Sequence, residues 1–301
     1  MSPRPFKQID VFSPEPLRGN PLAVVLDGSG LDDHLLQRFA EWTHLSETTF
    51  LLPPTDPQAD YRVRIFTPGG ELPFAGHPTL GSCHAWLEAG GIPKSAERIV
   101  QQCATGLVPI RREATRLAFA APALSRSSPS PGLLARVAAA LGLKAHQVLA
   151  AQCLDNGPVW LGLLLDRSDT VLALEPDHVA LKELGVKVGV AAIPVEPQPT
   201  GLIARSNREA RAFAGRESHP VGLEVRAFAA SIGIDEDPVT GSLNASLAQW
   251  LIDEGRLPSS YVAAQGQCLG RAGRVHVERD AAGQVWIGGA SITCIDGSVM
   301  L

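Results

Sequence analysis

The sequence predicts an α+β protein built from two similar lobes, and an internal repeat is the main observation behind this prediction. Residues 63–66, Val-Arg-Ile-Phe, and residues 225–228, Val-Arg-Ala-Phe, are β-like runs, each followed by a loop and a helix-like stretch. The two helix-like stretches open on similar blocks, His-Pro-Thr-Leu-Gly-Ser at 77–82 and Asp-Pro-Val-Thr-Gly-Ser at 237–242. A duplicated strand–loop–helix unit predicts two lobes that face each other across a pseudo-twofold cleft. Neither βαβ regularity nor a Gly-x-Gly-x-x-Gly turn is present, which argues against a dinucleotide-binding fold.

The first lobe is expected to contain many strands and few helices. Asp32 and Asp33 place negative charge at the start of its first helix, and Gly90 stands where its second helix should end. Hydrophobic alternation and β-rich composition predict strands at 5–12, 21–26, 48–53, 60–66 and 107–120, with helices at about 32–44 and 78–89.

The only Ser/Pro-rich stretch, residues 121–132, is the natural boundary between the lobes. We therefore assign 1–122 to an N-terminal lobe and 130–290 to a C-terminal lobe, with 290–301 as a candidate strand of the first lobe. Ser130 and Pro131 can cap and begin a helix that runs to about Leu141. Further elements are expected as strands at 157–165, 188–194, 200–205, 222–228, 260–265, 273–279 and 284–295, and a helix from about 239 to 254 that ends before Gly255.

Composition is that of an ordinary globular protein, with 45% hydrophobic and 19% charged residues. A net charge of −5 argues against a nucleic-acid or anionic-membrane partner. The five cysteines are an odd number without a Cys-x-x-Cys pair, so neither a disulfide framework nor a zinc knuckle is indicated. With no signal region and no membrane-spanning stretch, we expect a cytoplasmic protein with a small-molecule partner, and a homodimer stays open.

Polar residues at the borders of loops are the candidates for chemistry. Glu47 lies between a predicted helix and a β-branched, aromatic strand, where an apolar margin would raise its pKa toward the value that a general acid/base needs. The alternative is a loop glutamate bonded to backbone N–H groups. Asn20, in Arg-Gly-Asn-Pro, is a second polar residue at such a border.

His77 and Asp237 occupy matching places in the two repeats, each directly before a proline at a predicted helix start. Asp-Pro is a favoured cap and first helical residue, so Asp237 can be catalytic or only a helix cap. Histidine is not a favoured cap, and its imidazole can exchange a proton with a ligand. His77 and His84 lie seven residues apart with no third ligand, so we expect no metal.

Several motifs are distributed along the whole chain. They are Gly-Asn-Pro-Leu-Ala-Val-Val at 19–25, Ser-Glu-Thr-Thr-Phe-Leu at 46–51, the stretch 67–79 that ends in Phe-Ala-Gly-His-Pro-Thr, Glu-Asp-Pro-Val-Thr-Gly-Ser at 236–242, and Gln265-Gly266 with 269–275. Together they resemble the PhzF-like phenazine-biosynthesis isomerase family, in family order from residue 6 to about residue 297. The resemblance implies a diaminopimelate-epimerase-like fold, in which each lobe is a curled, mostly antiparallel sheet around a central helix and the active site lies between the lobes.

The resemblance also implies roles for residues. In the best understood relatives, a glutamate matching Glu47 moves a proton between two carbons of a cyclic amino acid without a cofactor. No cofactor is therefore expected here. Residues matching His77 and Asp237 surround the substrate, whose carboxylate lies near the backbone N–H groups of both helix starts. The expected substrate-binding residues are Asn20, Gly76, Thr240, Gly241, Ser242, Gln265 and Gly266.

Epimerase relatives use two cysteines, one from each of the equivalent loops. Here the corresponding stretches, 74–77 and 236–239, contain no cysteine, and Cys83 lies about a turn and a half farther along its helix. A two-thiol mechanism is therefore excluded. The hypothesis is a cofactor-independent isomerase with Glu47 as general acid/base. A lyase or dehydratase that shares the first proton abstraction, and a metabolite-binding protein without turnover, remain the alternatives.

Overall fold

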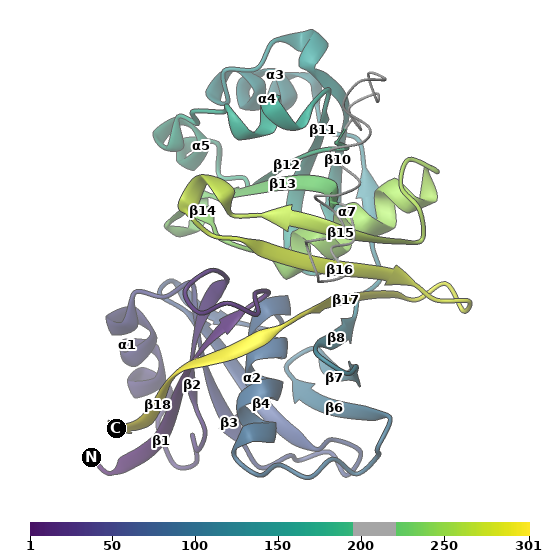
Figure 1. Ribbon diagram of the computed structural model, residues 1–301. Helices are drawn as coiled ribbons and strands as arrows, with labels where there is room; N and C mark the ends of the chain where they lie inside the picture. The colour runs from purple at the N-terminus through teal and green to yellow at the C-terminus, as the bar shows by residue number, and fades with distance from the viewer. Residues whose placement is uncertain (195–220) are drawn as a thin grey trace, which may run out of the picture.

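The computed structural model describes residues 1–194 and 221–301. In its N-terminal half, strands surround one long helix, α2 (Gly76–Glu88) (Figure 1). The other elements of this half are β1 (Pro3–Val11), β2 (Asn20–Val25), α1 (Asp33–Thr43), β3 (Glu47–Leu52), β4 (Tyr61–Thr67), β5 (Gly70–Leu72), β6 (Arg98–Cys103), β7 (Gly106–Arg112) and β8 (Leu117–Ala120).

The second half has the same plan, with α7 (Gly241–Asp253) as its long central helix (Figure 1). The remaining elements are β9 (Ser125–Ser127), α3 (Pro131–Ala140), β10 (Val148–Asp155), β11 (Val159–Leu165), α4 (Ser168–Leu172), α5 (His178–Leu184), β12 (Val188–Ala192), β13 (Val221–Ala229), β14 (Ile234–Asp237), β15 (Ser260–Gln265), β16 (Gly273–Arg279), β17 (Val285–Gly289) and β18 (Ser291–Met300).

One curled sheet runs through both halves, and its pairing pattern shows the repeat. In the first half, β2 and β3 are parallel, β3 and β4 antiparallel, and β4 and β6 parallel. In the second half, β11 and β12 are parallel, β12 and β13 antiparallel, and β13 and β15 parallel. The halves join where β17 pairs with β8, and β18 returns to pair with β1. The predicted α+β fold with two pseudo-symmetric lobes is confirmed.

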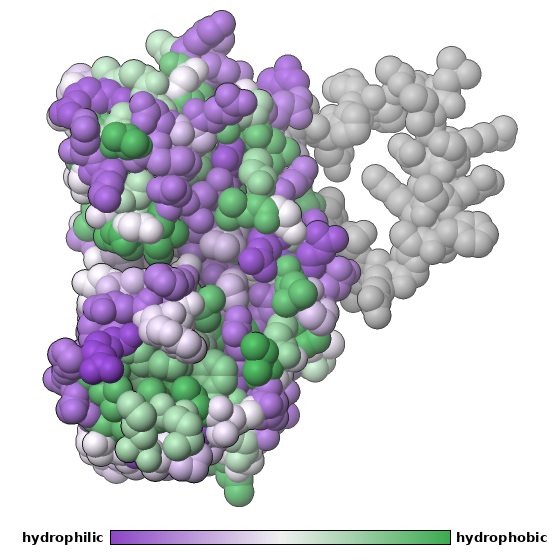
Figure 2. Space-filling view, turned by 90° about the vertical axis from the view of Figure 1, so that its left-hand side faces the viewer, coloured by the Kyte–Doolittle hydropathy of each residue, from purple (hydrophilic) through white to green (hydrophobic). Residues whose placement is uncertain are grey.

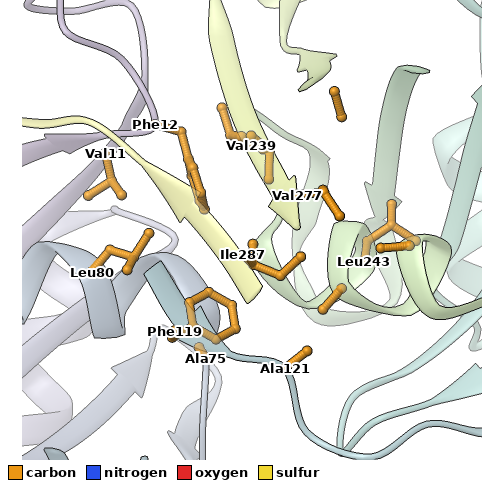
Figure 3. Close-up of a cluster of buried hydrophobic side chains, with 14 of the residues drawn as sticks. Val11, Phe12, Ala75, Leu80, Phe119, Ala121, Val239, Leu243, Val277 and Ile287 are labelled. Carbon is orange, nitrogen blue, oxygen red and sulfur yellow. The ribbon is translucent and has the colours of Figure 1, made fainter. Parts of the chain in front are cut away.

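The two central helices are buried because they carry small and apolar residues around most of their circumference. One hydrophobic cluster extends through both halves. Figure 3 shows part of it: Phe119 of β8 lies beside Ala75, which precedes α2, while Val239 lies just before α7 and Leu243 in its first turn. The starts of the two helices therefore pack on the same hydrophobic cluster.

Helix starts follow the capping chemistry read from the sequence in two places. Asp32 accepts a hydrogen bond from the Leu35 N–H at 2.8 Å and caps α1. Ser130 accepts one from the Leu133 N–H at 3.2 Å and caps α3, with Pro131 as the first helical residue. These starts depend on contacts within three residues, which is why the sequence alone could indicate them.

Other elements differ from the prediction. The expected strand at 107–120 is two strands, β7 and β8, and the expected strand at 284–295 is divided at Ala290 into β17 and β18. Ala290 marks the point where the chain leaves β16 and turns to β1, and its carbonyl accepts a hydrogen bond from the Phe12 N–H. The short helices α4 and α5 were not predicted, because five and seven residues are too few to show a helical period. The expected strand at 200–205 lies outside the described residues.

Apolar residues gather on the lower part of the face in Figure 2, which belongs to the N-terminal half. Met1, Trp42 and Met300 are large exposed hydrophobics of this half, and they line a cavity of about 550 Å³ near the chain ends. Grouped exposed apolar side chains are typical of contact surfaces. Among the helices of the described residues, none has the length and apolar character needed to cross a bilayer.

Candidate active site

Glu47 is the first residue of β3, opposite Leu22 of the parallel strand β2. The next two residues of β3, both threonines, are fully buried, so the strand carries the Glu47 side chain to the border of the core. That side chain is 14% exposed, and its Oε2 atom is buried without a hydrogen-bond partner among the described residues. Burial, together with the charge of Asp237, raises the Glu47 pKa well above its ordinary value, and Lys187 opposes this shift.

His77 contacts Glu47 from the first turn of α2. Its Nδ1 atom lies 3.4 Å from Glu47 Oε2 and 3.4 Å from Asn20 Nδ2, and its side chain is 4% exposed. Burial lowers the His77 pKa to about 3, so the imidazole is neutral near pH 7. The Asn20 amide has two hydrogens, and Asp237 Oδ1 and the Val239 carbonyl accept them at 2.9 Å. With both hydrogens accepted elsewhere, the Asn20 amide has none left to donate to His77 Nδ1.

Asp237 is the last residue of β14, and its carboxylate is bound on both oxygens. Oδ1 accepts hydrogen bonds from Asn20 Nδ2 at 2.9 Å and Ser46 Oγ at 3.5 Å, and Oδ2 accepts one from Thr240 Oγ1 at 2.6 Å. Burial raises the Asp237 pKa to about 6 although these hydrogen bonds lower it. A carboxyl group with this pKa can hold or release a proton near neutral pH.

The expectation that Asp237 lies directly before a helix start is wrong. Helix α7 begins at Gly241, and its N-cap residue is Thr240, whose N–H donates to Gln265 Oε1 at 3.0 Å. His77 is likewise not before its helix but is the second residue of α2, which begins at Gly76. The two residues therefore do not occupy equivalent positions, because nine residues separate Phe66 from α2 and twelve separate Phe228 from α7. They meet instead through Asn20, which lies between them.

The residues that do correspond at the helix starts are Gly76 and Gly241. A Cβ atom on Gly76 would lie 3.0 Å from the Gly241 Cα and 2.7 Å from Phe119 Cζ, so only glycine allows this approach. The first-turn N–H groups and the positive dipole ends of both helices consequently lie close together. Such a pair of helix ends can bind a carboxylate.

Gln265 and Gly266, two further expected binding residues, contact the loop before α7. Gln265 Nε2 donates to the Asp237 carbonyl and to Thr240 Oγ1, while Gln265 Oε1 accepts from the Thr240 N–H. Gly266 adopts a φ of +96°, and a Cβ there would lie 2.6 Å from the Pro238 carbonyl oxygen. Their contacts in the structure are therefore with this loop, which places Asp237.

Three residues near the site were missed in the sequence. Trp160 Nε1 donates to Ser242 Oγ at 3.2 Å, Asn156 Nδ2 donates to the Ser242 carbonyl at 3.0 Å, and Lys187 interacts electrostatically with Glu47. A signal for Lys187 was present, because it directly precedes the predicted strand at 188–194 as Glu47 precedes the one at 48–53. No local pattern indicated the other two.

Comparison with known proteins gives a consistent result. The family described as "Phenazine biosynthesis-like protein" matches residues 9–297. The chain is 34% identical to "Antisense-enhancing sequence 1" of Schizosaccharomyces pombe, over 99% of both chains. It is 32% identical to the trans-2,3-dihydro-3-hydroxyanthranilate isomerase of Pseudomonas aeruginosa, over 92% of this chain and 90% of that protein. A PhzF-family crystal structure from Bacillus anthracis has the same fold, with a TM-score of 0.80, 23% identity and complete coverage of both chains.

Proposed function

Because the chain belongs to the phenazine biosynthesis-like protein family, we propose that it is an isomerase that moves a proton between two carbons of a small, carboxylate-bearing, cyclic amino-acid-like substrate. Support comes from the relative that is named an isomerase of a cyclic amino acid. The observation that carries the proposal is the buried Glu47 carboxyl, whose Oε2 has no hydrogen-bond partner among the described residues and lies 3.4 Å from His77 Nδ1.

In the proposed reaction, the Glu47 carboxylate removes a proton from an activated carbon of the substrate. The resulting carboxylic acid returns the proton to a second carbon. The proton is conserved and no net oxidation occurs, so the step requires no redox partner. A raised pKa suits this role, because the protonated form must survive long enough to donate. Neutral His77, whose Nδ1 lies 3.4 Å from Glu47 Oε2, is a polar neighbour of this carboxyl group.

The substrate carboxylate is proposed to bind at the adjoining starts of α2 and α7. There the first-turn N–H groups of both helices stabilise it, together with negative charge that develops in the intermediate. Asp237 and Asn20 would orient an amino or hydroxyl group, since their side chains form a fixed hydrogen-bonded pair beside His77. Each half of the molecule thus contributes part of the site.

The test is incorporation of solvent deuterium. Cyclic and aromatic amino acids, including trans-2,3-dihydro-3-hydroxyanthranilate, are screened for binding, and each ligand that binds is incubated in D₂O and examined by NMR. The parent protein should introduce deuterium at carbon, and Glu47→Gln should reduce the rate by about a hundredfold or more while binding changes little. Glu41→Gln, the same change on the exposed face of α1, is the matched control and should retain the parent rate.

The outcomes separate the alternatives. A ligand that binds and gains no deuterium would identify a metabolite-binding protein without turnover. A product lighter than its substrate by one water would identify a dehydratase. Equal rates for the parent and Glu47→Gln would remove Glu47 from the mechanism.

A further inference from the structure

Lys187 occupies in the C-terminal half the position that Glu47 occupies in the N-terminal half. In the first half, Thr48 pairs with Phe66 across β3 and β4, and Glu47 directly precedes Thr48. In the second half, Val188 pairs with Phe228 across β12 and β13, and Lys187 directly precedes Val188. Phe66 and Phe228 end the repeated four-residue runs, so the pseudo-twofold relation of the halves brings Glu47 and Lys187 into correspondence.

The surroundings of Lys187 place its ammonium group at the site. Its Nζ atom lies 5.1 Å from the centre of the Trp160 ring, and Trp160 in turn donates to Ser242 in the first turn of α7. Among the described residues Lys187 forms no direct ion pair, and the carboxylates within its electrostatic range are Glu47 and Asp155. The ammonium group is half-buried over the Trp160 ring and is not neutralised by an ion pair, so its charge acts on the nearby carboxylates.

We infer that Lys187 is the counter-charge of the Glu47 carboxylate, a positioning residue by which the C-terminal half keeps the proton carrier of the N-terminal half able to act as a base. The functional part of this inference rests on the proposed isomerase activity. The electrostatic part concerns two side chains of this chain and stands without a substrate.

The balance of charges around Glu47 explains why such a residue is needed. The charged and titratable groups around it are His77 from α2, Asp237 from β14 and Lys187 from the residue before β12. His77 is neutral, and Asp237 acts with burial to favour the protonated form of Glu47. Lys187 is the cation among them, and it favours the carboxylate. Burial disfavours the charged form of Lys187. The carboxylates of Glu47 and of Asp155, the last residue of β10, favour it.

Without Lys187, burial and the negative charge of Asp237 would both raise the Glu47 pKa, and no cation among the described residues would oppose them. The acid form would then persist to higher pH, and a smaller fraction of the protein would be competent to remove a proton. An opposite charge within several ångströms shifts a carboxyl pKa by about one to three units. The lower end of that range corresponds to an about tenfold loss of the base form wherever the acid form dominates.

The experiment measures the titration of Glu47 directly. The C=O stretch of the protonated carboxyl group is followed by infrared difference spectroscopy against pH, and the band that disappears in Glu47→Gln belongs to Glu47. In Lys187→Met the midpoint of this band should move upward by about one pH unit, and in Lys187→Arg, which retains the charge, it should move less. Lys182→Met, on the exposed side of α5, is the matched control and should leave the midpoint in place.

Deuterium exchange provides the second measurement. The acid limb of the parent profile should move upward in Lys187→Met by the same amount, with activity recovering at higher pH and KM nearly unchanged. An unmoved infrared midpoint in a folded Lys187→Met protein would overturn the inference. So would a KM that rises at every pH, because that result would make Lys187 a ligand of the substrate carboxylate. Absence of exchange in the parent would count against the proposed function alone, since the infrared titration still decides the role of Lys187.

Discussion

Replacement of Asp237 by asparagine should reduce the stability that the protein loses as pH rises, while it damages the site. Burial raises the Asp237 pKa from an ordinary 3.8 to about 6. A difference of about two units, at about 1.36 kcal/mol each, corresponds to roughly 3 kcal/mol. Because the folded state binds the proton more tightly than the unfolded state, stability is lost as pH rises from about 4 through 6. The ionised carboxylate is therefore a cost that the folded protein carries at neutral pH.

The assay is urea unfolding of the parent and Asp237→Asn at pH 5 and pH 8. About half of the roughly 3 kcal/mol falls between these pH values, so the parent should lose about 1.5 kcal/mol more than the variant. Removal of the charge also lowers the Glu47 pKa, which acts in the same direction. Other titrating groups are common to both proteins and cancel. The exposed Asp235 on the same strand is the matched control, and Asp235→Asn should follow the parent.

The same variant should lose exchange activity for a reason visible in the hydrogen bonds. If the new Oδ1 still accepts from Asn20, the new amide NH₂ group faces Thr240 Oγ1, which now donates to Asp237 and already accepts from Gln265. The Thr240 oxygen has lone pairs for both amides, but the hydrogen of its hydroxyl group loses its acceptor. An identical dependence of stability on pH in the parent and Asp237→Asn would refute the reasoning, since it would mean that Asp237 does not carry the raised pKa.

Two further predictions follow from the geometry. Iodoacetamide should modify the exposed Cys268 and leave exchange activity largely intact, because Cys83 is buried and its pKa is raised to about 12; rapid inactivation that a bound ligand prevents would contradict this, and peptide mass mapping identifies the modified thiol. Gly241→Ala would place a Cβ 3.0 Å from the Gly76 Cα, so it should separate the helix starts and reduce exchange by about tenfold or more, with a parent-like circular dichroism spectrum as the folding control; full activity in that variant would show that the site does not need their close contact.

The sequence motifs indicated which polar side chains would meet at one site. The structure brings Glu47, His77, Asp237 and Asn20 into one hydrogen-bonded and electrostatic group, as the resemblance implied for a shared site. Their roles in a reaction remain predictions. The sequence register of the repeat was less informative, because similarity of two six-residue blocks suggested that His77 and Asp237 correspond. Their backbone positions differ, and Gly76 and Gly241 are the pair that meets.

Local chemistry explains what the sequence by itself determined. The caps at Asp32 and Ser130, the helical periods and the repeated β-like runs involve residues a few positions apart, and their energies depend on neighbours that the sequence displays directly. Together with the motifs, they were sufficient for the α+β class and the two-lobed plan.

The tertiary structure alone decided which distant groups share the site and what their charges do to one another. Asn20 and Asp237 are 217 residues apart, and Trp160 and Ser242 are 82 apart. The raised pKa of Asp237 arises from burial, and the register of β12 against β13 gives Lys187 the position in its half that Glu47 has in the other. Burial and electrostatic interaction depend on distances through space, and those distances exist only after both halves have folded against each other.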